Sequence, residues 1–134
     1  MDNCIFCKIV NKEIPNYTVR EDQHSLAFLD INPHAKGHTV VIPKQHVETA
    51  LELADEEFAK LAASVKRAME VVNKVLSPDG FNVGWNHGAA GGQAVSHLHI
   101  HIMPRWESDG GGSMHSIVNN LGDMPVEELA KLFQ

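Results

Sequence analysis

The chain has 134 residues, of which 43% are hydrophobic and 21% charged, and a formal net charge of −6. This composition excludes a disordered chain, and the negative charge argues against nucleic acid or an anionic membrane as partner, since each needs a basic face. We find no apolar run of membrane-helix length and no signal-peptide core, so we expect a cytoplasmic protein. Without repeats, linkers or a shift in composition, we predict a single domain over residues 1–134.

The first third of the chain predicts a short helix and three strands. Residues 5–13 are expected to form a short helix or turn. Strands are expected at Tyr17–Glu21 and Ser25–Ile31, joined as a hairpin. After a break at Asn32-Pro33, a third strand is expected at His38–Pro43, which is rich in β-branched residues.

A long helix is predicted in the middle of the chain. Apolar residues recur there at spacings of three and four, which is typical of one buried helix face. The residues of this face are Phe58, Leu61, Ala62, Val65, Met69, Val72 and Leu76. Asp55 is the predicted N-cap, and Ser77-Pro78-Asp79-Gly80 is expected to end the helix.

Two further strands follow, at Phe81–Asn86 and Val95–Met103, with a flexible turn at Gly88–Gly92 between them. Residues 106–134 are expected to form a variable region, with a mobile glycine-rich loop and then a short amphipathic helix that Pro125 opens. The predicted fold class is therefore α+β, with a mostly antiparallel sheet of about five strands and one long helix packed on a face. The sequence does not specify the strand order.

Three of the nine histidines alternate with aliphatic residues in His97-Leu98-His99-Ile100-His101. In an extended strand the imidazoles lie on one face, ~6.6 Å apart, and the aliphatic side chains lie on the other face, under the helix. Three imidazoles on one face are difficult to bury, which favours a functional role. Two roles stay open at this point. The imidazoles are either ligands of a catalytic metal ion, or a nucleophile with acid–base partners, since neutral imidazole attacks phosphorus.

A glycine-rich segment from Asn86 to Gln93 leads into the histidines. Glycine lets the backbone approach a ligand closely, and consecutive N–H groups can hold an anion. A plain hairpin turn is the alternative. The position directly before three aligned histidines favours an anion pocket.

The segment His97 to Met103 resembles the signature of the histidine-triad (HIT) family, His-φ-His-φ-His-φ-φ with φ apolar. The resemblance extends from about residue 4 to residue 105 and leaves the last 29 residues as the variable part. The other segments that resemble the family are Ile14-Pro15, Leu26–Ile31, Gly37–Pro43 and Asn86–Gln93.

The resemblance implies a nucleotide hydrolase or transferase that attacks the α-phosphate of a nucleoside 5′-phosphate derivative, such as a phosphoramidate or a dinucleoside polyphosphate. His99 would be the nucleophile and form a nucleotidyl-histidine intermediate. His101 would hydrogen-bond the phosphoryl or leaving-group oxygen, a backbone carbonyl near His97 would hold the His99 ring, and His38 would complete the cluster. No catalytic metal ion is required for this chemistry, because positioning and N–H donors stabilise the charge.

The resemblance also implies a nucleotide pocket. The carboxylate of Asp30 would accept hydrogen bonds from both ribose hydroxyls, although a turn residue is the alternative. An apolar slot for the base, with a purine favoured, would consist of Ile14, Phe28 and Ile31. The phosphate site would be lined by Asn86, Gly92 and Gln93. Because members of the family are typically homodimers, we expect a homodimer here.

One position departs from the family pattern. Many members carry serine or threonine just after the glutamine, where this chain has Ala94. The missing hydroxyl bears on the protonation of an amine leaving group and leaves the nucleophile untouched. Two alternative functions follow from these residues. One is a nucleotide-binding module without catalysis, and the other is a metallohydrolase that holds its ion with the three histidines.

Cys4 and Cys7 supply two thiolates at the spacing of half a tetrahedral zinc site. His46 and His97 are the best candidates for the remaining ligands, and the family resemblance supports them. A closed shell of two cysteines and two histidines leaves no position for water, so this zinc would be structural. A pair of unliganded thiols is the alternative. The remaining histidines are treated as ordinary polar positions: His24, His34, His87 and His115.

Overall fold

The computed structural model describes residues 3–134, so Met1 and Asp2 of the predicted domain lie outside the described residues. A five-stranded antiparallel sheet with the order β1-β2-β3-β5-β4 forms its centre. The strands are β1 (Thr18–Glu21), β2 (Ser25–Leu29), β3 (Thr39–Pro43), β4 (Gly80–Gly84) and β5 (Ile100–Arg105). The predicted α+β class and strand number are confirmed, and the order of the strands is new information.

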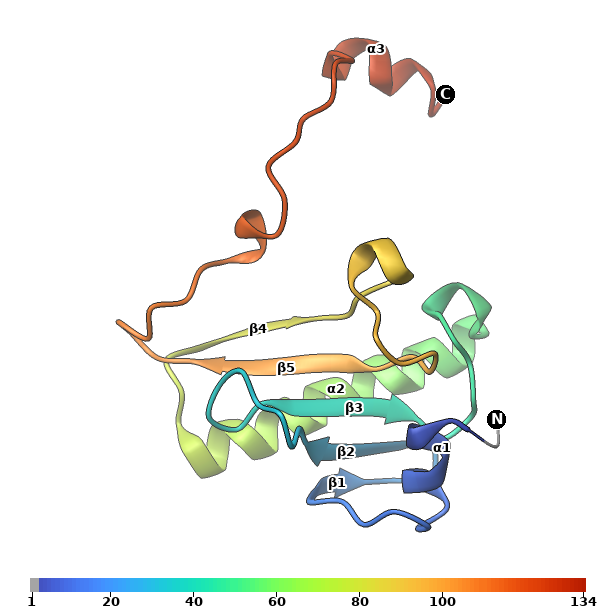
Figure 1. Cartoon of the computed structure of the whole chain (residues 1–134), viewed down its shortest axis with the longest axis vertical. Coiled ribbons are helices and arrows are strands. Elements are labelled where there is room, and N and C mark those ends of the chain that lie inside the picture. Colours follow the sequence, from blue (N-terminus) through green and yellow to red (C-terminus); the bar gives the residue numbers. More distant parts are fainter. Residues whose placement is uncertain (1–2) are drawn as a thin grey trace.

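Helices cover the two faces of the sheet (Figure 1). The long helix α2 (Asp55–Leu76) packs on one face, where its residues form a core with the aliphatic side chains of β3 and β5. The short helix α1 (Ile5–Val10) packs on the opposite face, where Ile9 forms a second core with Phe28 of β2 and Val40 of β3. Because both faces are covered, every residue of β3 is buried.

The helix α2 has the predicted length but differs in detail. Its N-cap is Ala54, and the predicted cap Asp55 is the first helical residue. Ala62 is exposed, whereas Ser64 and Ala68 lie on the buried face. An apolar periodicity overlooks a buried serine, which is stable here because its hydroxyl donates a hydrogen bond of 2.8 Å to the carboxylate of Asp22.

The strand that carries the histidines begins later than predicted. The sequence predicts Val95–Met103, whereas β5 pairs with β4 in a register that runs from Gly80 opposite Arg105 to Gly84 opposite His101. The residues before Ile100 lie outside the ladder. One backbone hydrogen bond of 2.8 Å, from the Leu98 N–H to the Val47 carbonyl, ties them to the loop after β3. His97 and His99 therefore precede the regular strand.

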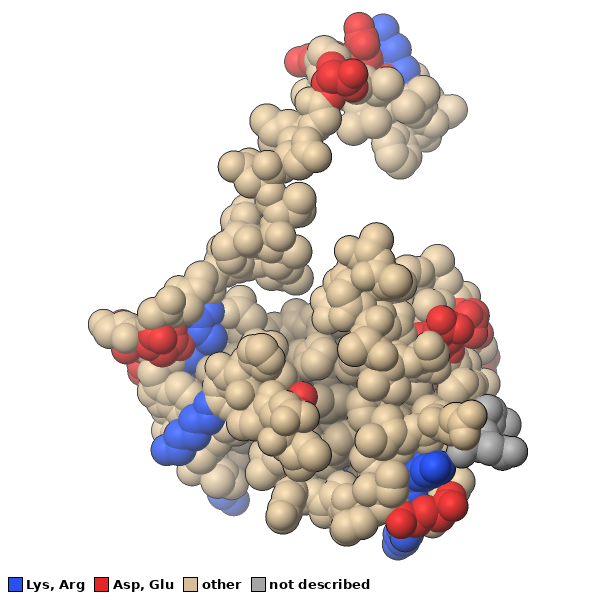
Figure 2. Space-filling model, in the orientation of Figure 1, with Lys and Arg blue, Asp and Glu red and all other residues tan. Residues whose placement is uncertain are grey.

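The C-terminal region leads away from the sheet (Figures 1 and 2). It contains a 3₁₀ turn at Met114–Ser116 and the helix α3 (Val126–Lys131), which Pro125 caps, so the predicted short helix is confirmed. Its large apolar side chains are exposed, with Leu121 at 94% and Phe133 at 85%. Over residues 3–134, no helix combines the length and the apolar character needed to cross a bilayer.

Candidate active site and metal centre

The three histidines occupy different environments. Leu98, Ile100 and Ile102 pack in the core under α2, as predicted. The expectation that the histidine face is difficult to bury is wrong, because His97 is 0% and His99 only 7% exposed. The reason is α1, whose Phe6 ring packs edge-on against both imidazoles at centroid distances of 5.9 and 5.1 Å.

The ring of His99 is hydrogen-bonded to the backbone through one nitrogen, and the ring lines a cavity. Its Nδ1 lies 2.7 Å from the carbonyl oxygen of His97. A carbonyl only accepts hydrogen bonds, so this contact assigns the proton of the neutral ring to Nδ1 and leaves a lone pair on Nε2. His99 also lines a cavity of about 1150 Å³, comparable to the largest small-molecule sites. A neutral imidazole with a free Nε2 is the form that attacks phosphorus.

A hydrogen-bond chain assigns the proton of His101 as well. The His34 backbone N–H donates to Nδ1 of His38 at 3.2 Å, so the proton of His38 is on Nε2. That Nε2 donates to Nδ1 of His101 at 2.9 Å, which leaves the His101 proton on its own Nε2. His101 also lines the cavity, and its ring centroid is 5.1 Å from that of His99. A proton donor thus lies beside the free lone pair of His99.

The electrostatics of the cluster keep the imidazoles of His38 and His101 neutral. Burial lowers the pKa of His38, and the carboxylate of Asp30, 3.7 Å from its Nε2, opposes this shift. Burial, together with the neighbouring His99 and His38, lowers the pKa of His101 to about 4. At neutral pH the hydrogen-bond chain therefore has the neutral tautomers assigned above.

A pH dependence of stability follows. The pKa of His101 is about 4 in the folded protein and near 6.5 in an unfolded chain, so unfolded chains bind the proton first. His38, His99, His34 and Asp30 face this ring. We expect the contribution of the neutral His101 ring to the free energy of unfolding to be complete above pH 6.5 and to be lost as the pH falls towards 4. Urea unfolding at several pH values should show a steeper acid loss of unfolding free energy for the wild type than for His101→Gln. Equal slopes would contradict the assignment.

Most residues of the predicted nucleotide pocket line the large cavity. They are Ile14, Phe28, Asp30, Ile31, His38, Asn86, Gly92, His99 and His101, and Ala94 lies among them. Gln93 is not part of this lining. Its Oε1 accepts a hydrogen bond from the Gly88 N–H at 2.9 Å, and its Nε2 donates to the carbonyls of Glu48 and Val95 at 2.8 and 3.0 Å. The side chain of Gln93 therefore holds the loop in place.

The glycine loop is a self-bonded turn. The N–H groups of Gly91, Gly92 and Gln93 donate to carbonyls of Gly88 and Ala89, and the N–H of Gly88 donates to Gln93 Oε1. Gly88 and Gly92 adopt φ values of 74° and 95°, which favour glycine. The expected cradle of free N–H groups is not formed by these four residues, because each donor already has a partner within the loop.

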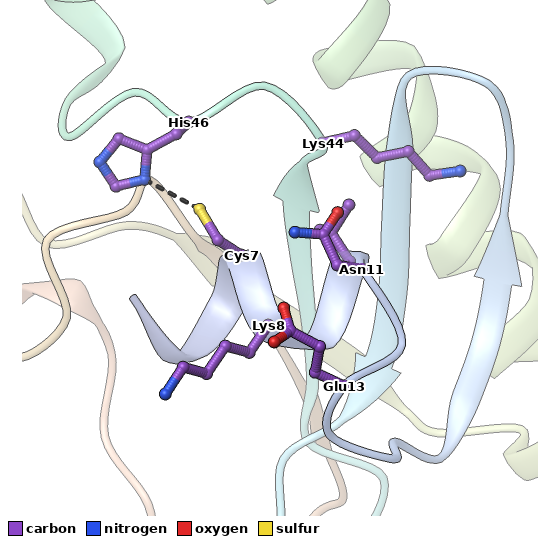
Figure 3. Close-up of a pocket in the computed structure, with 7 residues that line it drawn as sticks. Cys7, Lys8, Asn11, Glu13, Lys44 and His46 are labelled. Atoms are coloured by element: carbon purple, nitrogen blue, oxygen red, sulfur yellow. Dashed lines mark hydrogen bonds between the residues drawn. The ribbon is translucent and has the colours of Figure 1, made fainter. Parts of the chain in front are cut away.

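The four predicted metal ligands converge at the start of α1. The Sγ atom of Cys7 lies 3.1 Å from Nδ1 of His46 and 3.6 Å from Nδ1 of His97, and the Sγ atom of Cys4 lies 3.4 Å from the same His97 atom. All four ligand atoms are within 4.8 Å of one another. Figure 3 shows Cys7 pointing at His46, and both side chains line a cavity of about 520 Å³.

The surroundings of the cluster fit a zinc ion. Nε2 of His97 donates to the Pro43 carbonyl at 2.9 Å, so its Nδ1 lone pair faces both thiols, as in metal-bound histidines. Cys4 is the N-cap of α1 and accepts the Cys7 N–H. Burial, followed by the hydrogen bond with Cys4, raises the pKa of Cys7 to about 11, a shift that a bound dication would oppose. Two thiols and two imidazoles are the donors that tetrahedral zinc prefers.

The hypothesis of a catalytic ion held by all three triad histidines finds no support in the geometry. Within residues 3–134, the side chains grouped closely enough to hold an ion are the four above and a second set of Asp30, His38 and His101. Neither group contains His99. In the second set, Nε2 of His38 carries a proton, because its Nδ1 accepts the His34 N–H, so its lone pair is not available to a metal ion.

Two participants in the site are missing from the sequence analysis. One is the backbone N–H of His34, which decides the tautomer of His38. The other is Phe6, which contacts two of the three triad histidines. Its only sequence signal is its position between Cys4 and Cys7, which becomes informative once the cysteines are placed beside His97.

Comparisons with known proteins agree on one family. The HIT domain model matches residues 11–108. An uncharacterized HIT-like protein of Methanocaldococcus jannaschii is 53% identical over 107 residues, which cover 80% of this chain and 82% of that protein. The adenosine 5′-monophosphoramidase of Schizosaccharomyces pombe is 46% identical over 103 residues, which cover 77% of this chain and 74% of that protein.

A solved structure agrees with these sequence matches. The crystal structure of a HIT-family member from Bacillus subtilis superposes with a TM-score of 0.85 at 40% identity and covers 98% of this chain and 92% of that one. Family model, sequence relatives and solved structure thus each extend over most of the chain and include the three histidines, and we conclude that this protein belongs to the HIT domain family.

Proposed function

We propose that this protein hydrolyses, or transfers from, nucleoside 5′-phosphate derivatives through a covalent nucleotidyl-histidine intermediate on His99. The observation that carries the proposal is the orientation of the His99 ring. Its Nδ1 is hydrogen-bonded to the His97 carbonyl, which leaves the lone pair on Nε2, and the ring lines the cavity. The name of the Schizosaccharomyces pombe relative, a monophosphoramidase, supports the same class of substrate.

The proposed reaction has two steps. First, the Nε2 lone pair of His99 forms a bond to the α-phosphorus, and the bond from phosphorus to the leaving group breaks. The leaving group keeps the electron pair, accepts a hydrogen bond from His101 Nε2 and takes its proton from a water molecule, which becomes hydroxide. Second, a water oxygen attacks phosphorus and its proton neutralises the hydroxide formed in the first step, while the phosphorus–nitrogen bond breaks and its electron pair returns to Nε2 of His99. The mononucleotide is released, and neither step requires a catalytic metal ion.

The remaining parts of the pocket are proposed to hold the nucleotide. One oxygen of Asp30 accepts the Asn32 N–H at 2.8 Å, which makes it the turn residue considered above, and the other oxygen is left for the ribose hydroxyls. The base, with a purine favoured, would lie in the apolar slot formed by Ile14, Phe28 and Ile31. Cys4, Cys7, His46 and His97 would hold a structural zinc ion.

Rapid-quench kinetics tests the covalent step. A nucleoside phosphoramidate labelled at the α-phosphate is mixed with the protein without added divalent ions and quenched with alkali within milliseconds. We expect labelled protein that keeps its phosphorus–nitrogen bond in alkali and loses it in acid, formed before mononucleotide appears. Nucleotide binding with neither adduct nor turnover would instead establish the non-catalytic binding module.

Restoring a hydroxyl at position 94 tests the role of the departure from the family pattern. Ala94 lines the cavity, and a serine there would donate a proton towards the leaving group. We expect Ala94→Ser to raise kcat for amine leaving groups by about tenfold, which is less than the ~10²-fold lower end of general acid catalysis because a serine hydroxyl is a weak acid, and to change little for leaving groups that need no proton. Ala94→Val is the size control and should give no increase. An equal gain in both variants would reject a proton-transfer explanation.

A homodimer is also proposed, with a second copy of this chain covering exposed surface. Two features support it. The strand β4 is an edge strand that pairs with β5 alone, and the segment after Trp106 exposes apolar residues such as Ile117 and Leu121. Light scattering coupled to gel filtration should give twice the monomer mass for the full chain. For a chain ending at residue 112, the measured mass should fall towards that of the monomer as the protein is diluted. A monomeric full chain at tens of micromolar would contradict the proposal.

A further inference from the structure

The metal centre and the nucleophile are joined by a short physical connection. The ring of His97 faces the two thiols through Nδ1, and the carbonyl of the same residue accepts the hydrogen bond that orients His99 at 2.7 Å. Any rotation of the His97 peptide moves this carbonyl. The position of the His97 ring therefore bears directly on the orientation of the His99 ring.

Phe6 provides a second connection between the same two parts. It lies between Cys4 and Cys7 on α1, so ligands of the metal centre flank it on both sides. The edge-on contacts of its ring have interplanar angles of 87° with His97 and 70° with His99. Such edge-on pairs are favourable and directional, since the positive ring edge meets a negative ring face. The Phe6 ring also packs edge-on against Phe28, at a centroid distance of 5.8 Å.

The sheet alone does not fix this part of the chain. Regular pairing of β5 begins at Ile100, so His97 and His99 precede the ladder. Near them, one hydrogen bond from Leu98 to the Val47 carbonyl ties the backbone to another segment. The buried side chain of His99 must therefore be positioned by what packs on it, and its aromatic neighbours are Phe6 of α1 and His101, each at a centroid distance of 5.1 Å.

We propose that Phe6 is a positioning residue for His99, and that the centre of Cys4, Cys7, His46 and His97 keeps the nucleophile oriented through Phe6 and the His97 carbonyl. When the centre is loaded with zinc, His99 is held as a single tautomer with its proton on Nδ1 and its Nε2 towards the cavity. When the centre is empty, α1 loosens and the ring of His99 samples both tautomers. The consequence for catalysis rests on the proposed function, whereas the orientation does not.

Nitrogen NMR of labelled histidines tests the orientation without any turnover. At fixed neutral pH, the ¹⁵N shifts of a neutral imidazole distinguish a protonated nitrogen from one with a lone pair, and the His99 signals are assigned by their loss in His99→Gln. We expect two well-separated nitrogen shifts in the zinc-loaded protein, averaged shifts after the zinc is removed with a chelator, and recovery on reloading. Separated shifts in the zinc-free wild type would overturn the coupling.

A matched pair of variants isolates Phe6. Phe6→Leu and Phe28→Leu remove neighbouring aromatic rings that both line the cavity, but only Phe6 contacts the histidines. With one zinc per chain confirmed for each, Phe6→Leu should average the His99 shifts and lower kcat by about tenfold or more, with KM changed by less than about threefold. Phe28→Leu should keep the separated shifts and mainly raise KM.

The outcomes are distinguishable from a failure of the proposed function. Separated His99 shifts in folded, zinc-loaded Phe6→Leu would overturn the positioning role. The zinc-removal arm uses the wild-type chain and gives its answer even if Phe6→Leu fails to fold. If the wild type shows no turnover at all, the proposed function fails, while the NMR arms still decide whether the metal centre orients His99.

Discussion

His99→Gly is expected to abolish turnover, with kcat reduced by at least ~10⁴-fold, while the nucleotide still binds. The magnitude follows because loss of a nucleophile removes the covalent route and leaves only binding and charge stabilisation. Binding persists because Asp30 and the apolar slot around Phe28 stay in place at the cavity. Steady-state kinetics and calorimetric titration with a mononucleotide measure the two quantities separately.

Two additions make this prediction specific. His24→Gln removes a histidine that lies between β1 and β2 and does not line the cavity, so it should keep the wild-type rate. Free imidazole should restore part of the activity of His99→Gly, because it enters the space left by the ring and supplies a nitrogen nucleophile. Full activity of His99→Gly would refute the assignment of the nucleophile.

Removal of zinc is expected to lower the thermal unfolding midpoint by about 10–20 °C. An ion present at a thousand times its dissociation constant stabilises the folded state by about 4 kcal/mol, and each kcal/mol shifts the midpoint of a chain of this size by about 3–5 °C. The proposed ligands come from α1 and its N-cap, from the loop after β3 and from the start of the histidine segment, so a bound ion would link three separate segments. Scanning calorimetry before and after chelation measures the shift.

The controls for zinc removal use the neighbouring side chains of α1. Cys7→Ser should have the low midpoint from the start and show no further decrease with chelator. Lys8→Ala changes the next residue, which lines the smaller cavity but has no ligand atom in the cluster, and should respond to chelator as the wild type does. A wild-type midpoint that chelation leaves unchanged would show that the four side chains hold no stabilising ion.

These two predictions distinguish the loss of the reacting side chain from the loss of the structure that positions it. The expected loss in His99→Gly is a loss of the proposed reacting atom, whereas zinc removal is expected to act at a distance, through α1 and the His97 carbonyl. Zinc-free protein that is still folded should therefore retain a reduced activity. The helix α1 is a short element that packs on one face of the sheet, while α2 and its core cover the opposite face (Figure 1).

Features with a local physical cause were predictable from the sequence. The apolar spacing of Leu61, Val65 and Val72 predicted α2, because the period of a helix is a property of its backbone. The alternation of Leu98, Ile100 and Ile102 predicted their packing under α2 for the same reason. The Cys-x-x-Cys spacing indicated half of a metal site, since two thiols three residues apart reach one ion from a single turn of helix.

Features that depend on partners from remote segments were decided by the tertiary structure alone. His97 is 54 residues from the Pro43 carbonyl that fixes its ring, and His38 is 63 residues from His101. The burial of His99, its tautomer and the strand order all depend on which segments meet. A histidine in a sequence has two nitrogens of similar basicity, and only the neighbour that arrives on folding determines which nitrogen keeps the lone pair.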